Sequence, residues 1–229
     1  MHVPDGFLDA TTSVATLAVA GVAVAGSLAR AAKEEVDDRT APLAGLVAVF
    51  VFASQMLNFP VGAGTSGHLI GAVLAAVLVG PATATLCLTV VLAVQAFLFA
   101  DGGVSAIGSN VLLMGVVAVW VGYGAFRVAL ALLPTRVWSV PVAAGVGAFV
   151  SVPGAALAFV GLYAVGGAVP IPLSTFALTM GGWHVLIGLG EALITVFAVS
   201  SILAARPDLV RGARGTLPAL ELRTPEVVR

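Results

Sequence analysis

The feature that most constrains this chain is a succession of long apolar runs separated by short polar loops. Of its 229 residues, 60% are hydrophobic and 9% are charged, and the mean hydropathy is +1.12. A water-soluble fold has no interior large enough for so much apolar surface, so the chain is predicted to be an integral membrane protein. Its net charge of -1 argues against a nucleic-acid-binding protein, which needs a basic face to neutralise phosphates.

A helix that crosses a bilayer needs about 20 apolar residues, or fewer when neighbouring helices surround it. Seven candidate spans follow from this rule: residues 11–29, 41–57, 68–79, 82–100, 109–126, 140–163 and 183–204. We expect a kink at Pro153 in the sixth span. The charged residues 30–39 are expected to form a loop, and the glycine-rich residues 58–67 are expected to be irregular. The prediction is therefore an all-α protein with seven transmembrane helices.

The distribution of basic residues predicts the orientation. With the N-terminus outside, all ten Lys and Arg residues fall in inner loops or in the C-terminal tail, as expected for cytoplasmic segments. If the short segment 68–79 did not cross, Arg127 and Arg136 would lie on the opposite side of the membrane from Arg30. We therefore predict that it crosses, and that residues 1–205 form one transmembrane domain in a bacterial-type inner membrane. Residues 206–229 are predicted to be a disordered cytoplasmic tail.

The three histidines, His2, His68 and His184, all lie on the outer side or in the outer half of a span in this arrangement. Such a grouping indicates a metal site, although a hydrogen-bonded structural role is the alternative for each histidine alone. Asp5, Asp9 and Asp101 are the acidic residues expected outside. They either attract cations to this face or are simply solvated.

His2 directly follows Met1, and the start residue is expected to stay in place because no positively charged leader precedes the first apolar run. The Met1 amine, the His2 amide nitrogen and the His2 imidazole can close fused chelate rings around one ion. The His68 imidazole can fill the fourth corner, and four nitrogens in a tetragonal set suit Ni(II) or Cu(II). Mg(II) and Ca(II) prefer oxygen ligands. Because amine and imidazole must lose protons to bind, metal capture is expected to weaken in acid.

Other polar residues are weaker candidates for supporting roles. His184 and Glu191 are seven residues apart, so they share one face of the seventh span. The alternative is that Glu191 pairs only with a hydroxyl such as that of Thr195, one turn further on. Ser109 and Asn110, at the start of the fifth span, either donate hydrogen bonds into the outer cavity or cap that helix.

Several motifs resemble one known family. They are Met-His-Val-Pro-Asp-Gly-Phe-Leu at residues 1–8, Asn-Phe-Pro-Val at 58–61, Gly-Thr-Ser-Gly-His at 64–68, Phe-Ala-Asp-Gly-Gly at 99–103, Gly-Ser-Asn at 108–110, His-Val-Leu-Ile-Gly at 184–188 and Glu-Ala-Leu-Ile-Thr at 191–195. In these motifs the chain resembles the substrate-capture (S) component of energy-coupling-factor (ECF) transporters for nickel and cobalt, the CbiM/NikM family. Some members of that family carry a cleavable leader ahead of the histidine, whereas Met-His opens this sequence.

The resemblance implies a seven-helix protein whose N-terminal segment, residues 1–10, folds back so that Met1, His2 and His68 meet around one metal ion. It also implies that the transported ion is Ni(II) or Co(II), that no organic cofactor is bound, and that Asp101 belongs to a shared motif near the site. The implied partners are a transmembrane coupling subunit, cytoplasmic ATPase subunits and in some systems a small accessory membrane protein. ATP hydrolysis is expected in those partners, because the sequence has no Gly-x-x-x-x-Gly-Lys-Ser/Thr loop.

Two other functions remain as alternatives. A stand-alone secondary metal permease would transport without any ATPase partner. An intramembrane hydrolase using His68, His184 and Glu191 is disfavoured, because the sequence has no His-Glu-x-x-His helix.

Overall fold

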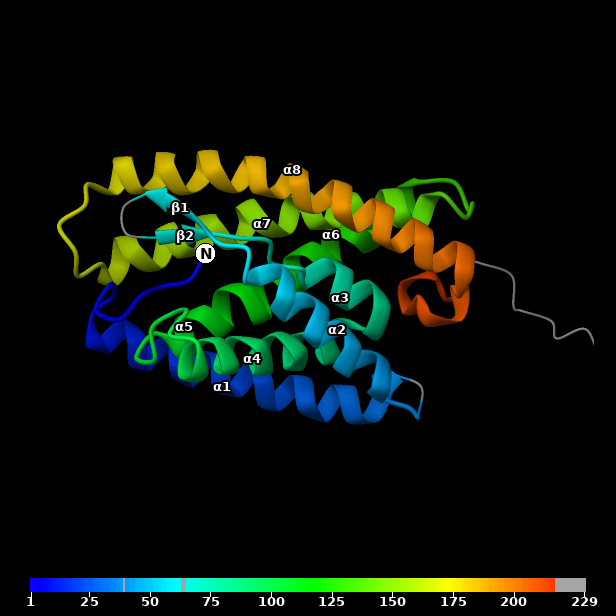
Figure 1. Cartoon of the computed structure of the whole chain (residues 1–229), viewed down its shortest axis with the longest axis horizontal. Helices are drawn as coiled ribbons and strands as arrows, with labels where there is room; N and C mark the ends of the chain where they lie inside the picture. The colour runs from blue at the N-terminus through cyan, green and yellow to red at the C-terminus, as the bar shows by residue number, and fades with distance from the viewer. Residues whose placement is uncertain (39, 63–64, 217–229) are drawn as a thin grey trace, which may run out of the picture.

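The computed structural model describes residues 1–38, 40–62 and 65–216. Within these ranges the helices are α1 (Ala10–Arg30), α2 (Thr40–Gln55), α3 (Ala72–Val79), α4 (Pro81–Leu98), α5 (Ile107–Asn110), α6 (Ala118–Leu132), α7 (Ser139–Gly166) and α8 (Leu173–Ala205). A π-helical turn, η1 (Ala31–Glu35), extends α1, and a second, η2 (Val111–Val117), joins α5 to α6 in one continuous helix. The described residues therefore form seven helical segments, which confirms the predicted fold class (Figure 1).

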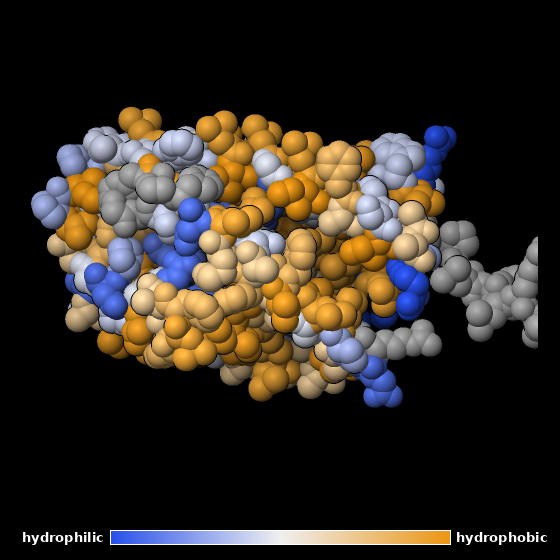
Figure 2. All heavy atoms as spheres, viewed as in Figure 1, coloured by the Kyte–Doolittle hydropathy of each residue, from blue (hydrophilic) through white to orange (hydrophobic). Residues whose placement is uncertain are grey.

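Five of these segments in the described ranges are long and apolar enough to cross a membrane: Ala10–Glu35, Pro81–Leu98, Ile107–Leu132, Ser139–Gly166 and Leu173–Ala205. On the face drawn in Figure 2, apolar residues cover most of the middle of the bundle, and the most hydrophilic residues lie toward its two ends. This distribution is the one that a bilayer requires, because charged groups are costly in its hydrocarbon interior. The chain is a multi-pass membrane protein.

The short helix α3 lies inside the bundle rather than against lipid. All eight of its residues are buried, and it contacts α2, α4, α6 and α7. It begins at Ala72 instead of residue 68, because Gly71 has a left-handed backbone (φ +74°) that interrupts the helix. Its complete burial agrees with the prediction that so short a helix must be surrounded by other helices of the protein.

Three predicted loop regions differ from the structure. Within the range 58–67, predicted to be irregular, β1 (Phe59–Gly62) pairs antiparallel with β2 (Thr65–Gly67). Residues 30–39 are not all loop, because η1 continues α1 to Glu35, whose side chain is buried. The helix α8 begins at Leu173, ten residues before the predicted start, since its first turn packs into an aromatic cluster described below. The helix α7 runs through Pro153 without ending.

The first part of the predicted tail packs onto the bundle. After α8 come two 3-10 turns, η3 (Pro207–Leu209) and η4 (Arg211–Ala213), and Val210 and Ala213 are buried. The Arg211 guanidinium donates to the backbone carbonyls of Glu34 and Glu35. This part of the tail is therefore ordered against the end of η1, while residues 217–229 lie outside the described ranges.

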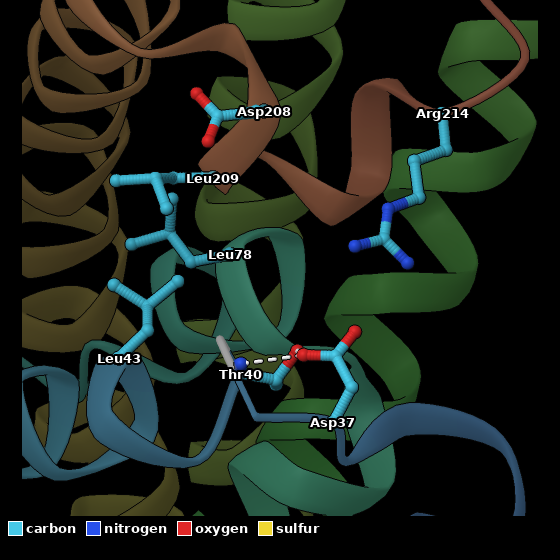
Figure 3. A pocket seen from close by; sticks show the side chains of 7 residues that line it. All are labelled: Asp37, Thr40, Leu43, Leu78, Asp208, Leu209 and Arg214. Atoms are coloured by element: carbon cyan, nitrogen blue, oxygen red, sulfur yellow. Dashed lines mark hydrogen bonds between the residues drawn. The ribbon is translucent and has the colours of Figure 1, made fainter.

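A cavity of about 260 Å³ opens beside the tail. Its lining residues, shown in Figure 3, are Asp37, Thr40, Leu43, Leu78, Asp208, Leu209 and Arg214. Asp37 caps α2 there, since its carboxylate accepts from the Thr40 backbone N–H at 2.7 Å. None of the predicted metal-site residues lines this cavity.

Candidate metal centre

An aromatic cluster holds the N-terminal segment, residues 1–9, inside the molecule. The Phe7 ring centroid lies 5.4 to 5.5 Å from those of three other rings, which belong to Phe159, Tyr163 and Phe176. The first two come from α7 and the third from the first turn of α8. Burying four aromatic side chains together is a large apolar gain. It anchors the segment and explains the early start of α8.

Main-chain hydrogen bonds align the segment with the loop between α4 and α5. The Gly103 N–H donates to the Val3 carbonyl at 2.9 Å. The approach is so close that a Cβ on Gly103 would lie 2.4 Å from the Asp5 nitrogen, so only glycine fits. The Asn110 side chain accepts from the Val3 N–H at 2.7 Å and donates to the Val3 carbonyl at 3.1 Å. Asn110 thus pairs with Val3 as a neighbouring strand would.

These contacts bring the predicted ligands together. Met1, His2 and His68 are 0%, 4% and 0% exposed. The His2 and His68 rings stack, with centroids 4.5 Å apart and planes 30° from parallel. Figure 1 shows the N-terminus within the body of the molecule, beside the strands. The sequence-based prediction that the N-terminal segment folds back into the bundle is confirmed.

Both ring nitrogens of His2 face polar side chains. Its Nε2 lies 3.1 Å from Gln95 Oε1, and its Nδ1 lies 3.1 Å from Asp101 Oδ1. The other Asp101 oxygen accepts from Asn58 Nδ2 at 2.9 Å. Sequence reasoning missed Gln95, although a fully buried glutamine in an apolar span is the kind of polar residue that indicates a functional site.

His68 presents one nitrogen that is free to bind a metal. Its Nδ1 lies 2.8 Å from the Leu69 carbonyl oxygen, which can only accept, so Nδ1 carries the proton. Its Nε2 therefore has the lone pair, and in the described structure this buried atom has no hydrogen-bond partner. A buried acceptor without a partner is costly unless something else occupies it.

Glu191 fixes the backbone that follows His68. Its carboxylate accepts from the N–H groups of Ile70 at 2.6 Å and Gly71 at 3.0 Å. Gln55 Nε2 donates to the Ile70 carbonyl at 2.8 Å. The alternative that Glu191 pairs only with a hydroxyl such as that of Thr195 is therefore wrong, because its carboxylate satisfies N–H groups that the start of α3 leaves unpaired.

Burial at the centre favours a neutral Met1 amine. Burial lowers the pKa of the Met1 amine from 8.0 to about 4, although the charges of Asp101 and Glu191 act to raise it. Partial burial raises the pKa of Asp101, but the hydrogen bond and charge of His2 outweigh it, so the pKa is lowered overall. At neutral pH the amine therefore has a free lone pair and a carboxylate stands beside it. The proton loss that the sequence-based argument requires of the amine is therefore complete well below neutral pH.

Side chains alone do not make a metal site here. Among residues 1–38, 40–62 and 65–216, no three His, Cys, Asp or Glu side chains are grouped so that they could hold one ion. A site at this position would need at least one other kind of donor, and the buried Met1 amine lies among the candidates, with His2 and His68 also buried.

Comparison with known proteins gives the family of this chain. The family model CbiM, described as the cobalt uptake substrate-specific transmembrane region, matches residues 2–209. The chain belongs to the CbiM family. Membership makes it a multi-pass membrane component of metal transport rather than an enzyme.

Three proteins illustrate the likeness. A putative metal transport protein of Haloquadratum walsbyi is 39% identical over 92% of this chain and 93% of its own length. A putative fused nickel transport protein NikMN of Archaeoglobus fulgidus is 38% identical, over 92% of this chain and 68% of its own length. The crystal structure of a transition metal transporter has a TM-score of 0.82 at 30% identity and covers 93% of this chain and 98% of that one.

The remaining predicted residues of this CbiM-family chain lie around the centre. His184 is fully buried; its Nδ1 lies 2.7 Å from the Met180 carbonyl oxygen, and its Nε2 has no hydrogen-bond partner in the described residues. The Ser109 hydroxyl bonds that of Thr16 at 2.8 Å and so ties α5 to α1 instead of pointing at the ligands. Ser109 and Asn110 do not cap the helix, which begins at Ile107.

Proposed function

We propose that this chain is the substrate-binding membrane component of an ATP-driven importer of the ECF type for nickel or cobalt ions. The ion is held by the Met1 amine, the His2 amide nitrogen, His2 Nδ1 and His68 Nε2. The observation that carries the proposal is the burial of the Met1 amine beside the stacked His2 and His68 rings, where His68 Nε2 has no other partner.

The donor set favours a particular class of ion. Three of the nitrogens come from consecutive groups of Met1 and His2, so they close fused rings in one plane, and His68 approaches from a different segment. Four nitrogens in a plane suit Ni(II) best, and Co(II) also accepts imidazole nitrogen. Relatives are named as nickel or cobalt transport proteins. We therefore prefer nickel and keep cobalt as the second substrate.

In this proposal the N-terminus faces outside and the C-terminus faces the cytoplasm. The ion arrives from outside, and movement driven by the partner ATPase subunits through the coupling subunit releases it inward. All ten basic residues then lie on the inner side. A permease working alone would continue to import metal in cells that lack every ATPase partner. Under this proposal, import stops in such cells.

The test is metal binding by the purified protein with one glycine added ahead of Met1. The extension removes the primary amine from its position, so Ni(II) affinity should fall at least 100-fold in isothermal titration. The matched control carries the same glycine after Arg229 and should bind like the wild type. A His68→Gln variant removes one ligand without touching the N-terminal segment and should also bind weakly. Equal affinity of the extended and control proteins, both folded by thermal unfolding, would reject the site.

A further inference from the structure

The three proposed ligand residues are closed off from solvent, but the neighbouring residue Asp101 is partly exposed to it. Side-chain exposure is 4% for His2 and 17% for Asp101, while Met1 and His68 are 0% exposed. Asp101 lies in the loop after α4, outside the spanning segments. A carboxylate at this position is in contact with both the outer solution and the buried centre.

The distance between Asp101 and His2 fits two ligands of one ion. Asp101 Oδ1 and His2 Nδ1 are 3.1 Å apart. Two donor atoms that each lie about 2.1 Å from an ion, at a right angle, are about 3 Å apart. In addition, His2 Nδ1 is buried, and the polar side chain that it faces is this carboxylate. The pair can therefore hold one divalent ion at neighbouring corners.

The local backbone positions Asp101 for this contact. Ala100 is the one described residue other than glycine with a positive φ, at +52°, a conformation that costs free energy and persists only where the surroundings require it. It turns the chain so that the Asp101 N–H donates to the Gln95 carbonyl at 3.0 Å. Asn58 holds the outer carboxylate oxygen. Gln95 thus orients both Asp101, through its backbone, and His2, through its side chain.

We propose that Asp101 is the first ligand that an incoming divalent metal ion meets, and that it passes the ion to His2 Nδ1. This inference deepens the proposed function and rests on it. The carboxylate attracts the hydrated cation and replaces one of its waters. His2 Nδ1 then binds the same ion at the adjacent corner before the amine and His68 complete the set. A nitrogen set holds Ni(II) more strongly than an oxygen ligand does, so the transfer is downhill.

Stopped-flow mixing of the purified protein with Ni(II) at low ionic strength tests the role. Asp101→Asn should lower the association rate constant about tenfold and weaken its salt dependence, with little change in the dissociation rate constant, because a charge at the rim of a site acts mainly on arrival. Asp101→Glu keeps the charge and should restore most of the rate.

The matched control is Asp9→Asn, which removes a negative charge from the same end. Asp9 caps α1 by accepting from the Thr12 N–H at 2.7 Å, and asparagine caps helices equally well. This variant should associate like the wild type. Association by Asp101→Asn that is as fast as that of Asp9→Asn, or a defect confined to dissociation, would overturn the inference. So would Asp101→Glu as slow as Asp101→Asn.

The outcomes separate the two proposals. If the glycine extension ahead of Met1 abolishes tight binding while Asp101→Asn associates normally, the metal centre stands and the role of Asp101 fails. If the extension leaves binding unchanged, the metal centre itself fails, whatever Asp101 does.

Discussion

Two buried glutamates, one at each end of the short helix α3, make the same kind of contact. Their expected effects on metal binding differ. Glu191 is 2% exposed and accepts from the N–H groups of two residues at the start of α3. Glu35 is 4% exposed and accepts from the N–H groups of Ala82 at 3.2 Å and Thr83 at 2.7 Å, at the start of α4. Each carboxylate satisfies N–H groups that a helix start leaves unpaired.

The two contacts differ in what lies beside them. The segment held by Glu191 begins two residues after His68, so the carboxylate also sets the direction of that imidazole. The turn held by Glu35 is followed only by α4 and is flanked by Arg211 of the tail. A buried carboxylate in an apolar bundle therefore fixes the position of the backbone that it binds. The effect of that contact on function depends on which residue lies next to this backbone in the chain.

Among changes to these carboxylates, the largest effect is expected from Glu191→Ala. Removing the carboxylate frees the Ile70 and Gly71 N–H groups and lets the His68 ring turn, so Ni(II) affinity should fall about 10- to 100-fold, as is usual when a group that orients a metal ligand is lost. Thermal stability should fall as well. Isothermal titration and thermal unfolding in the same detergent measure the two effects separately. Wild-type affinity in this variant would show that His68 is positioned without Glu191.

Glu35→Ala should change stability alone. Two buried N–H groups lose their acceptor at about 1–3 kcal/mol each, so we expect a loss of about 2–6 kcal/mol in the free energy of unfolding. Nickel affinity of the folded fraction should stay within about twofold of the wild type, since no proposed ligand is displaced. This variant is the matched control for Glu191→Ala. A loss of affinity equal to that of Glu191→Ala would mean that the two contacts are not functionally distinct.

Much of this fold follows from the sequence because apolar run length and basic-residue position are strong signals in membranes. Seven helical segments and a short buried third helix were expected on these grounds. The folded-back N-terminus was implied by the resemblance to the CbiM/NikM family. Helix limits were less predictable where tertiary contacts decide them. The early start of α8 depends on Phe176 joining rings from α7, and the late start of α3 depends on Gly71 and Glu191.

The sequence indicated which types of residue form the candidate centre better than it indicated how those residues are arranged in space. His2 and His68 stood out because histidines are rare in this chain, but their stacking depends on hydrogen bonds that have no local pattern in sequence. Glu35 was assigned to a charged loop, because nothing in Lys-Glu-Glu tells which glutamate turns inward. Asn110 was expected near the centre, yet its pairing with Val3 links positions 107 residues apart.

Asp5 is an exposed counterpart of the two buried glutamates, and its substitution is expected to have the smallest effect on the protein. Its carboxylate also accepts two hydrogen bonds, from the Ser105 N–H at 2.8 Å and the Ser105 hydroxyl at 2.5 Å. These bonds lower the pKa of Asp5 below its ordinary 3.8. The stabilisation is therefore fully present above pH 3.8 and is lost as the pH falls through the lowered pKa.

Asp5→Asn should speed hydrogen exchange of amides in the N-terminal segment about two- to fivefold near neutral pH, a modest effect because the group is exposed to water. The difference from the wild type should shrink as the pH falls below 3.8, since the wild-type carboxyl becomes neutral like the amide. Exchange rates, corrected for the intrinsic effect of pH, measure this directly. A difference that persists unchanged at pH 2.5 would mean that the shape of the side chain, and not its charge, holds the segment. The exposed contact would then differ in kind from the two buried ones.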